Sequence, residues 1–180
     1  RKDIPFRCEY RFVRPDGSET WVLGLATPHR DSTGRTGGIV GTVTDISEQK
    51  LAADKLLEHA QSRIRLHEIT ANGSLSLEEK IDQLLELGIE TFRLQMGIIS
   101  HIEDGIYTVE RIAGPEGSPA AGATFPLEDA YCSDTLKANG PIGFHHAGEG
   151  PYQTHPCYKK FFLEAYLGCP LMVDGKVYGT

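Results

Sequence analysis

The stretch Gly41-Thr42-Val43-Thr44-Asp45-Ile46-Ser47-Glu48-Gln49-Lys50 decides how this chain is organised. Its first half ends a segment rich in strand-forming residues, and its second half begins a long pattern of polar and apolar residues with helical spacing. A strand that runs directly into a rigid helix can pass a mechanical signal from one module to another. We therefore expect this stretch to be an output junction between two modules.

Composition agrees with an ordinary globular chain. Of the 180 residues, 39% are hydrophobic and 24% are charged, which allows one or two domains with a real core. A net charge of -7 argues against broad nucleic-acid binding. There is neither an apolar run of about 20 residues nor a basic leader, and the cysteines Cys8, Cys132, Cys157 and Cys169 form no CxxC pair. We expect reduced thiols, a cytoplasmic location and no membrane contact by this fragment, although a longer parent protein could be membrane-anchored.

The region before the junction carries three strand patterns. Apolar residues alternate with charged ones from Phe6 to Phe12, and Pro15-Asp16-Gly17 supplies the chemistry of a tight turn. A second strand is expected from Thr20 to Thr27, with Trp21, Leu23 and Leu25 on one face. A third is expected from Gly38 to Ile46. Together they predict an antiparallel sheet.

These strands resemble the C-terminal half of a PAS domain over residues 4 to 49. The resemblance rests on a Phe-x-x-Glu-Tyr-Arg start at Phe6, an Arg-Pro-Asp-Gly hairpin, the Trp21-Val22 pair and the Gly-Thr-x-x-Asp-Ile-Ser exit. It implies that the family's first strands and pocket helices precede Arg1, so that this chain closes no PAS pocket by itself. We assign residues 1–48 to this module. Asp45 is expected to cap the following helix and, by the resemblance, to relay the signal together with Ile46.

The junction is followed by a predicted linker helix at residues 49–73, ended by Asn72-Gly73 with Gly in the left-handed conformation. Small and apolar residues recur at spacings of seven, then four, three, four, three and four: Ile46, Ala53, Leu57, Ala60, Ile64, His67 and Ala71. This a/d series predicts a parallel dimeric coiled coil in which Leu57 and Ile64 relay the signal. The alternative is a single amphipathic helix that packs on its own domain.

A second module begins with Ser76-Leu77-Glu78-Glu79, a capping-box pattern that starts a new helix. Glu103-Asp104-Gly105 predicts a hairpin between strands at 96–102 and 107–113. The further elements expected are a strand at 123–127, a helix at 130–138, a strand at 142–146, a short helix to Phe162, and a hairpin of 165–173 with 176–180.

This order resembles a GAF domain over residues 75 to 180. The resemblance rests on Ile98 to Ile102, on Ala130 to Leu136, and on the closing stretch from Tyr166 to Thr180. We assign residues 74–180 to this module and expect it to be truncated, because such domains normally add a final helix. The predicted fold class is α+β: an antiparallel PAS fragment, a long coiled-coil linker helix, and a GAF-like antiparallel sheet flanked by helices.

The resemblance implies a small-molecule ligand between the GAF-like sheet and the segments 131–136 and 145–158. The candidate ligand-binding residues are Tyr131, Cys132, His145, His146, His155, Cys157 and Tyr158. Imidazole and thiolate also bind metals, but sequence cannot bring these side chains together, and we expect no metal site. The ligand itself stays unknown.

Cys157 allows a sharper alternative. In bilin-binding photoreceptor GAF domains a cysteine near this position carries the chromophore, and His155-Pro156-Cys157-Tyr158 is similar, although Tyr158 replaces the usual histidine. A third reading is a free methionine sulfoxide reductase that uses Cys132 or Cys157. The motifs GxSxG, HExxH, Walker A and GxGxxG are absent, so we expect no catalytic residue here. We predict the input region of a bacterial histidine kinase or diguanylate cyclase.

Overall fold

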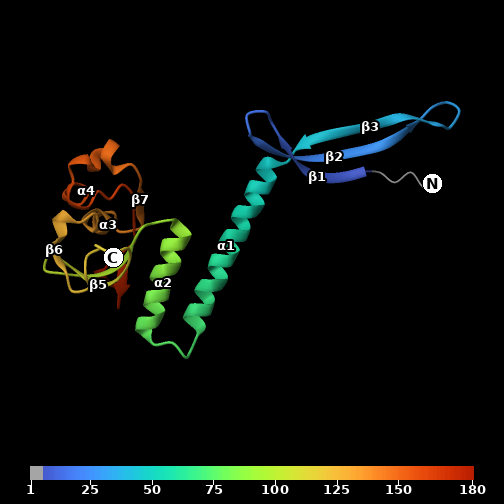
Figure 1. The fold of residues 1–180 in the computed structure, drawn as a ribbon. Helices are drawn as coiled ribbons and strands as arrows, with labels where there is room; N and C mark the ends of the chain where they lie inside the picture. Colours follow the sequence, from blue (N-terminus) through green and yellow to red (C-terminus); the bar gives the residue numbers. More distant parts are fainter. Residues whose placement is uncertain (1–5) are drawn as a thin grey trace. The chain divides into compact units, whose positions relative to one another are not determined.

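A computed structural model describes residues 6–180 (Figure 1). The first residues of the predicted PAS-like segment, 4 and 5, lie outside the described residues. The chain divides into two compact units, residues 1–63 and residues 64–180. The helix that follows the junction contributes to both.

The first unit contains a three-stranded antiparallel sheet in the order β1-β2-β3. Its strands are β1 (Phe6–Val13), β2 (Glu19–Arg30) and β3 (Thr36–Asp45). Gly17 takes the left-handed conformation at φ 83° in the turn between β1 and β2, and its N–H donates to the Arg14 carbonyl oxygen. Strands and turn therefore follow the sequence prediction, although β2 extends beyond the expected end at Thr27.

The two faces of this sheet follow from its register. Phe12 pairs with Thr20, and Val22 pairs with Asp45, so the side chains at even positions of β1 and β2 share a face with the odd positions of β3. The centre of that face is covered, since Thr20 and Val22 of β2 are 8% and 6% exposed, whereas its margins are open, with Phe12 and Ile39 58% and 75% exposed.

The corner between sheet and helix is closely bonded. The Ile46 N–H donates to the Trp21 carbonyl oxygen (2.8 Å), and the Trp21 N–H donates to Ser47 Oγ (3.0 Å). The Ser47 N–H donates to Asp45 Oδ1 (2.9 Å), which holds the pKa of that carboxyl below its usual value. Asp45 therefore caps the helix as expected, and Ile46 is buried beneath the corner.

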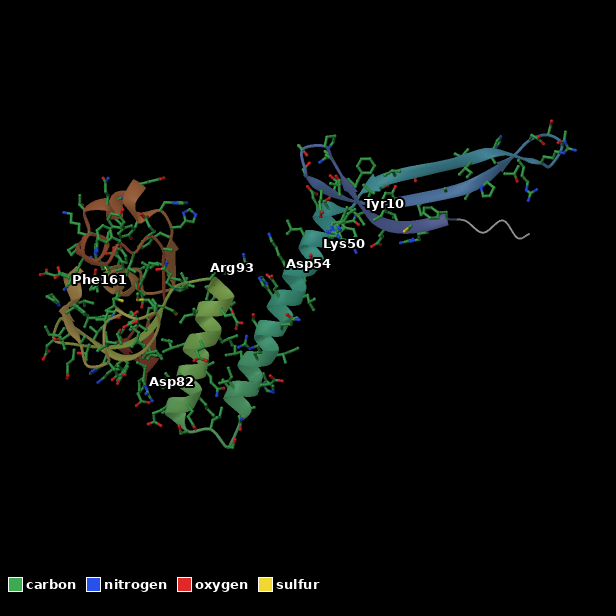
Figure 2. The ribbon with its side chains drawn as sticks, in the orientation of Figure 1. Tyr10, Lys50, Asp54, Asp82, Arg93 and Phe161 are labelled. Atoms are coloured by element: carbon green, nitrogen blue, oxygen red, sulfur yellow. The ribbon has the colours of Figure 1, made fainter. Side chains whose placement is uncertain are left out.

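Helix α1 (Ser47–Ala71) is fixed to the sheet by its first turn. Lys50 Nζ lies 2.7 Å from the Glu9 carboxylate and 5.2 Å from the centre of the Trp21 ring. Figure 2 shows Lys50 reaching from α1 toward the strand that carries Tyr10. A cation held between a carboxylate and an indole face ties the helix start to β1 and β2.

The second unit begins with the end of α1 and with α2 (Leu77–Phe92). The predicted capping box is present, since Ser76 Oγ accepts from the Glu79 N–H and Glu79 Oε2 accepts from the Ser76 N–H. The left-handed conformation predicted for Gly73 is wrong, because that glycine has no positive φ. The turn is made instead by Asn72, whose side-chain oxygen accepts from the Ser74 N–H and hydroxyl.

The central sheet of this unit has the order β4-β5-β6, formed by β4 (Gly97–Glu103), β5 (Ile106–Ala113) and β6 (Thr124–Pro126). The predicted hairpin at Asp104-Gly105 is confirmed, with both residues at positive φ. The Ser100 N–H donates to the Thr180 carbonyl oxygen (2.9 Å), so the end of the chain lies along β4.

The remaining elements pack around this sheet. They are η1 (Leu127–Asp129), α3 (Cys132–Ala138), β7 (Ile142–Phe144), η2 (Ala147–Glu149), η3 (Pro151–Thr154), α4 (Pro156–Phe161), β8 (Tyr166–Gly168), β9 (Leu171–Val173) and β10 (Lys176–Gly179). The observed core joins Tyr107, Val109 and Cys132 with Ile98 and Tyr166.

Two of the differences from the predicted strands in the second unit have a clear cause. The strand expected over 142–146 ends at Phe144, because His146 takes a left-handed conformation at φ 56°. The strand expected over 165–173 is split: β8 pairs with β7, whereas β9 pairs with β10. Pro170 lies at the break and lacks the N–H that a continuous ladder needs.

The architecture as a whole is mixed, with antiparallel sheets and helices as the α+β prediction stated. In the part of the chain that the structure describes, no helix has the length and apolar character needed to cross a membrane.

Candidate functional site

The second unit contains a cavity of about 990 Å³. Its walls come from α2, from the strands β4 and β5, from the start of α3, and from the segment that runs from α4 to β8. Known small-molecule sites have volumes of about 300–1,000 Å³ and mainly apolar walls. The size and position of this cavity make it the leading candidate site.

Polar character is unevenly distributed over the cavity walls. Side chains such as Leu84, Ile89 and Val109 make much of the wall apolar, and Val109 is only 1% exposed. The charged residues of the wall are all solvent-exposed, and they are Arg93, Asp129, Lys160 and Glu164. Charge therefore belongs to the rim of the cavity and not to its interior.

A row of hydroxyl and thiol groups crosses the buried wall. The Tyr166 hydroxyl donates to Cys132 Sγ (3.5 Å) and lies 2.7 Å from Thr135 Oγ1. Tyr107 packs in the same buried cluster as Cys132. Burial raises the pKa of both tyrosines, and the neighbouring Cys132 raises it further. These hydroxyls therefore stay neutral at any physiological pH.

Glycine makes room for this row. A side chain on Gly168 would overlap the Tyr166 hydroxyl and would place its Cβ 2.7 Å from Thr135 Oγ1. Because the Gly168 backbone packs directly on both hydroxyls, β8 fixes their positions at the cavity wall.

Tyr131 is the centre of an aromatic cluster beside the row. It is 1% exposed, and its ring lies 5.0 Å from Phe144, 4.6 Å from His155 and 5.5 Å from Tyr166, centre to centre. The Tyr131 hydroxyl donates to the Leu163 carbonyl oxygen (3.1 Å). Burial, with the nearby Cys157 thiol as the next cause, raises the pKa of Tyr131 to about 12. The cluster joins α3, β7 and β8 at one end of the cavity.

Cys157 lies at the start of α4, and the helix is capped by His155. The Cys157 N–H donates to His155 Nδ1 (3.1 Å), so that imidazole nitrogen is unprotonated. Burial lowers the pKa of His155 and raises the pKa of the Cys157 thiol. Both groups are therefore held in their neutral forms, which suits a cavity wall better than a nucleophile.

The structure separates the predicted ligand-binding residues into two groups. Tyr131, Cys132 and Cys157 line the cavity. His155 lies behind Tyr131, and the Tyr158 hydroxyl donates to Glu164 (3.1 Å), so neither belongs to the wall.

His145 and His146 are exposed and lie outside the cavity wall, with ring centres 4.7 Å apart. The sequence analysis placed both on a strand expected over 142–146, where adjacent side chains point to opposite faces. The chain leaves β7 before them, and Ala147 is then bonded through its N–H to the Glu164 carbonyl oxygen. Among residues 6–180, no three His, Cys, Asp or Glu side chains are placed to hold a metal ion together.

Sequence reasoning missed Tyr107 and Tyr166 as site residues. Both stood in recognised strand segments, and Tyr107 alternates with Val109 on the inward face of β5. A strand pattern alone does not distinguish a core side chain from one that lines a cavity. Only the fold shows that a hydroxyl from β5, a thiol from α3 and a hydroxyl from β8 meet in one row.

The comparisons with known proteins agree with the two parts of the chain. A family model described as the PAS fold matches residues 1–43. The PAS domain of a GGDEF family protein from Chromobacterium violaceum is 40% identical over 25% of this chain and 42% of its own length, with a TM-score of 0.22. The GAF domain from Acinetobacter phosphoenolpyruvate-protein phosphotransferase is 16% identical over 68% of this chain and 73% of its own, with a TM-score of 0.52. A search of curated proteins returned no match.

The predicted order of PAS followed by GAF is thereby confirmed. The N-terminal segment matches the PAS fold, and the later part of the chain has the fold of a GAF domain. The chain spans less than half of the PAS structure that it matches.

Proposed function

We propose that this chain is the sensory input region of a bacterial signal-transduction protein, and that the cavity of its GAF-like unit binds a small molecule. The observation that carries the proposal is the cavity itself: about 990 Å³, apolar inside and charged only at its rim. By the PAS and GAF resemblance, the output is a histidine kinase or a diguanylate cyclase elsewhere in the parent protein. The fragment performs no catalysis of its own.

A ligand can act only through its different affinities for two arrangements of the protein. The relay that we propose is the α1 helix, paired with its copy in a second chain as a parallel coiled coil. Leu57 and Ile64 from the a/d series are each 58% exposed, and Ile69 is the buried apolar residue of the helix. Such an unpartnered apolar series is what a dimer seam would cover.

The corner at Asp45 and Ile46 belongs to the same proposed relay. Its hydrogen bonds connect Trp21 of the sheet to Ile46 and Ser47 at the start of the helix, so a displacement of the sheet would also displace the helix. We propose that the PAS-like sheet and α1 move together at this corner, and that this is how the first module passes its state onward.

The cavity is tested by blocking it from α2. Gly88 lines the cavity and has open space where a side chain would be added, so Gly88→Phe should fill part of it without a clash. The neutral fluorescent probe N-phenyl-1-naphthylamine should bind the unchanged chain saturably, and Gly88→Phe should weaken binding at least tenfold. Gly73→Phe, in an open loop outside the cavity, is the matched control. Equal binding by both variants would remove the cavity from the proposal.

The dimer is tested by two matched double variants. Leu57→Glu with Ile64→Glu places charge in the proposed seam and should give a monomer in sedimentation, because unpaired charge is costly to bury. Leu56→Glu with Leu66→Glu changes two other exposed leucines of α1 and should leave the dimer intact. An unchanged chain that is monomeric at high micromolar concentration, or a seam variant that stays dimeric, contradicts the relay.

A bilin photoreceptor is a second candidate, favoured by one observation: the Cys157 thiol lines the cavity. A bilin supplied during expression should then attach covalently, give visible absorption, and be lost in Cys157→Ser. A colourless protein after such co-expression excludes this candidate. Methionine sulfoxide reduction is a weaker alternative, because burial raises the pKa of Cys157 and disfavours the thiolate that the chemistry needs.

A further inference from the structure

One exposed edge of the cavity, which we call its mouth, carries a lysine that lies against two aromatic rings. Lys160 Nζ is 5.0 Å from the centre of the Phe125 ring and 5.3 Å from the centre of the Phe161 ring. The two rings stand edge-on at 5.9 Å, and all three residues line the cavity. Ring faces attract an ammonium group. The positive charge of Lys160 is therefore held at the cavity wall.

Phe125 connects this charge to the buried interior. Its ring lies 6.3 Å from the ring of Tyr107, which is 6% exposed, and it packs against the core cluster that contains Tyr107. Lys160 itself is exposed to solvent. A molecule that lies along Phe125 would therefore have one end in an apolar interior and the other end within reach of an ammonium group.

The ammonium group of Lys160 has hydrogen-bonding capacity to spare. It has three N–H donors, and aromatic rings offer it no oxygen acceptor. Among residues 6–180, no carboxylate forms an ion pair with Lys160. An oxyanion of a ligand would bind it through a charge-assisted hydrogen bond.

The other charged side chains of the wall are less suited to bind an anion. Both carboxylate oxygens of Glu164 accept hydrogen bonds, from the Gly148 N–H (3.0 Å) and the Tyr158 hydroxyl (3.1 Å). Arg93 already has a partner within the protein. Asp129 is an exposed carboxylate that repels an anion. A ligand anion would therefore have to contact Lys160 directly to gain affinity at this mouth.

We infer that the ligand of this cavity is an amphipathic anion, with an apolar body that fills the interior and one carboxylate that Lys160 binds at the mouth. The inference rests on the proposed function, because it names the ligand class of the proposed site. Burial of the apolar body supplies most of the affinity. The ion pair contributes less, because it is exposed, and it selects the charged molecule over a neutral one.

Two competitors of nearly equal shape isolate the charge. 6-Phenylhexanoate has a carboxylate at the end of a flexible chain, whereas 6-phenylhexanamide has a neutral amide in its place. Each is titrated against the fluorescent apolar probe 2-phenylindole bound to the unchanged chain, at neutral pH and low ionic strength. We expect the carboxylate to displace the probe at a concentration about threefold to fivefold lower, the size of an exposed ion pair. Added salt should reduce this preference, because it screens exposed charges.

Variants locate the effect. Lys160→Met keeps an apolar side chain and removes the charge, so the preference for the carboxylate should disappear. Lys159→Met is the matched control, because Lys159 is the exposed neighbour on α4 and lies outside the cavity wall. This control should keep the full preference. Far-ultraviolet circular dichroism checks that each variant is folded, and the ratio in the unchanged chain needs no variant.

The outcomes distinguish this inference from the proposed function. If Gly88→Phe weakens the binding of 2-phenylindole but both competitors displace it equally, the cavity is a ligand site and the anion inference is overturned. A preference that survives in Lys160→Met, or that Lys159→Met lowers as much, overturns the assignment to Lys160. If 2-phenylindole does not bind, or if Gly88→Phe leaves its binding unchanged, the proposed cavity function fails and the inference fails with it.

Discussion

The sheet of the first unit and the core of the second are built from the same alternation of apolar and polar residues, but they are covered to different extents. In the first unit Val22 is 6% exposed at the centre of one face, but Phe12 and Ile39 on the same face are 58% and 75% exposed. In the second unit Val109 and Tyr131 are each 1% exposed; Val109 packs with Cys132 of α3, and the Tyr131 ring lies against Phe144, His155 and Tyr166. The pattern specifies a strand, whereas burial depends on what packs against it.

The difference in packing between the two units bears on where a ligand could bind. A side chain held on several sides has a fixed position and a controlled environment, which a selective ligand site needs. The open sheet offers apolar area without enclosure. This difference supports the proposal that ligand binding belongs to the second unit and mechanical coupling to the corner between β3 and α1.

The largest expected effect is on stability. Tyr131→Ala should lower the free energy of unfolding of the second unit by about 3 to 5 kcal/mol, because it empties the centre of the aromatic cluster. The same truncation at the exposed Phe12 should cost less than about 1 kcal/mol. Urea titrations followed by amide NMR signals of each unit measure both. Equal costs would mean that the two regions do not differ in packing.

Gly168→Ala tests the packing around the row of hydroxyls, and its expected effect on stability is of intermediate size. The added methyl group would overlap the Tyr166 hydroxyl and press on Thr135, so we expect a loss of about 1 to 3 kcal/mol. Gly140→Ala is the matched control, because its nearest neighbour would be 3.9 Å away, and it should be nearly neutral. Equal melting temperatures for the two variants would show that the Gly168 contact is not tight.

The smallest expected effect is a pH dependence at the cap of α4. Burial lowers the pKa of His155 below 6.5, although Asp134 and Asp129 oppose this shift and Lys137 adds to it. The unfolded chain therefore binds more protons between the two pKa values. The stabilisation is complete above about pH 6.5 and is lost as the pH falls through the folded-state pKa.

Protonation would also cost the hydrogen bond from the Cys157 N–H to His155 Nδ1. His155→Asn keeps a capping oxygen and cannot titrate. Melting temperatures between pH 7.5 and 5.5 should fall less steeply for this variant than for the unchanged chain. Parallel curves would show that His155 does not contribute to the pH dependence.

Much of the fold could be predicted because its determinants are local. Asp104-Gly105 makes a hairpin with the residues next to it, and the capping box at Ser76 needs only Glu79. The site was less accessible to sequence reasoning, because Tyr166 and Cys132 are 34 residues apart and meet only through the packing of β8 on α3. His145 and His146 were wrongly expected at the ligand site for the same reason: the chain leaves β7 before them and Ala147 bonds to Glu164, which is distant in the sequence.

The most direct test of ligand binding in the cavity of the second unit is an amide NMR titration of the labelled chain with 2-phenylindole. We predict saturable shifts in residues that line the cavity, such as Tyr107, Tyr131 and Tyr166, with no saturable shifts in β1, β2 or β3. The exposed apolar side chains of that sheet are an internal control, because a nonspecific apolar probe would bind them as well as the cavity. Shifts concentrated in that sheet, with the cavity residues unchanged, would contradict the assignment of ligand binding to the second unit.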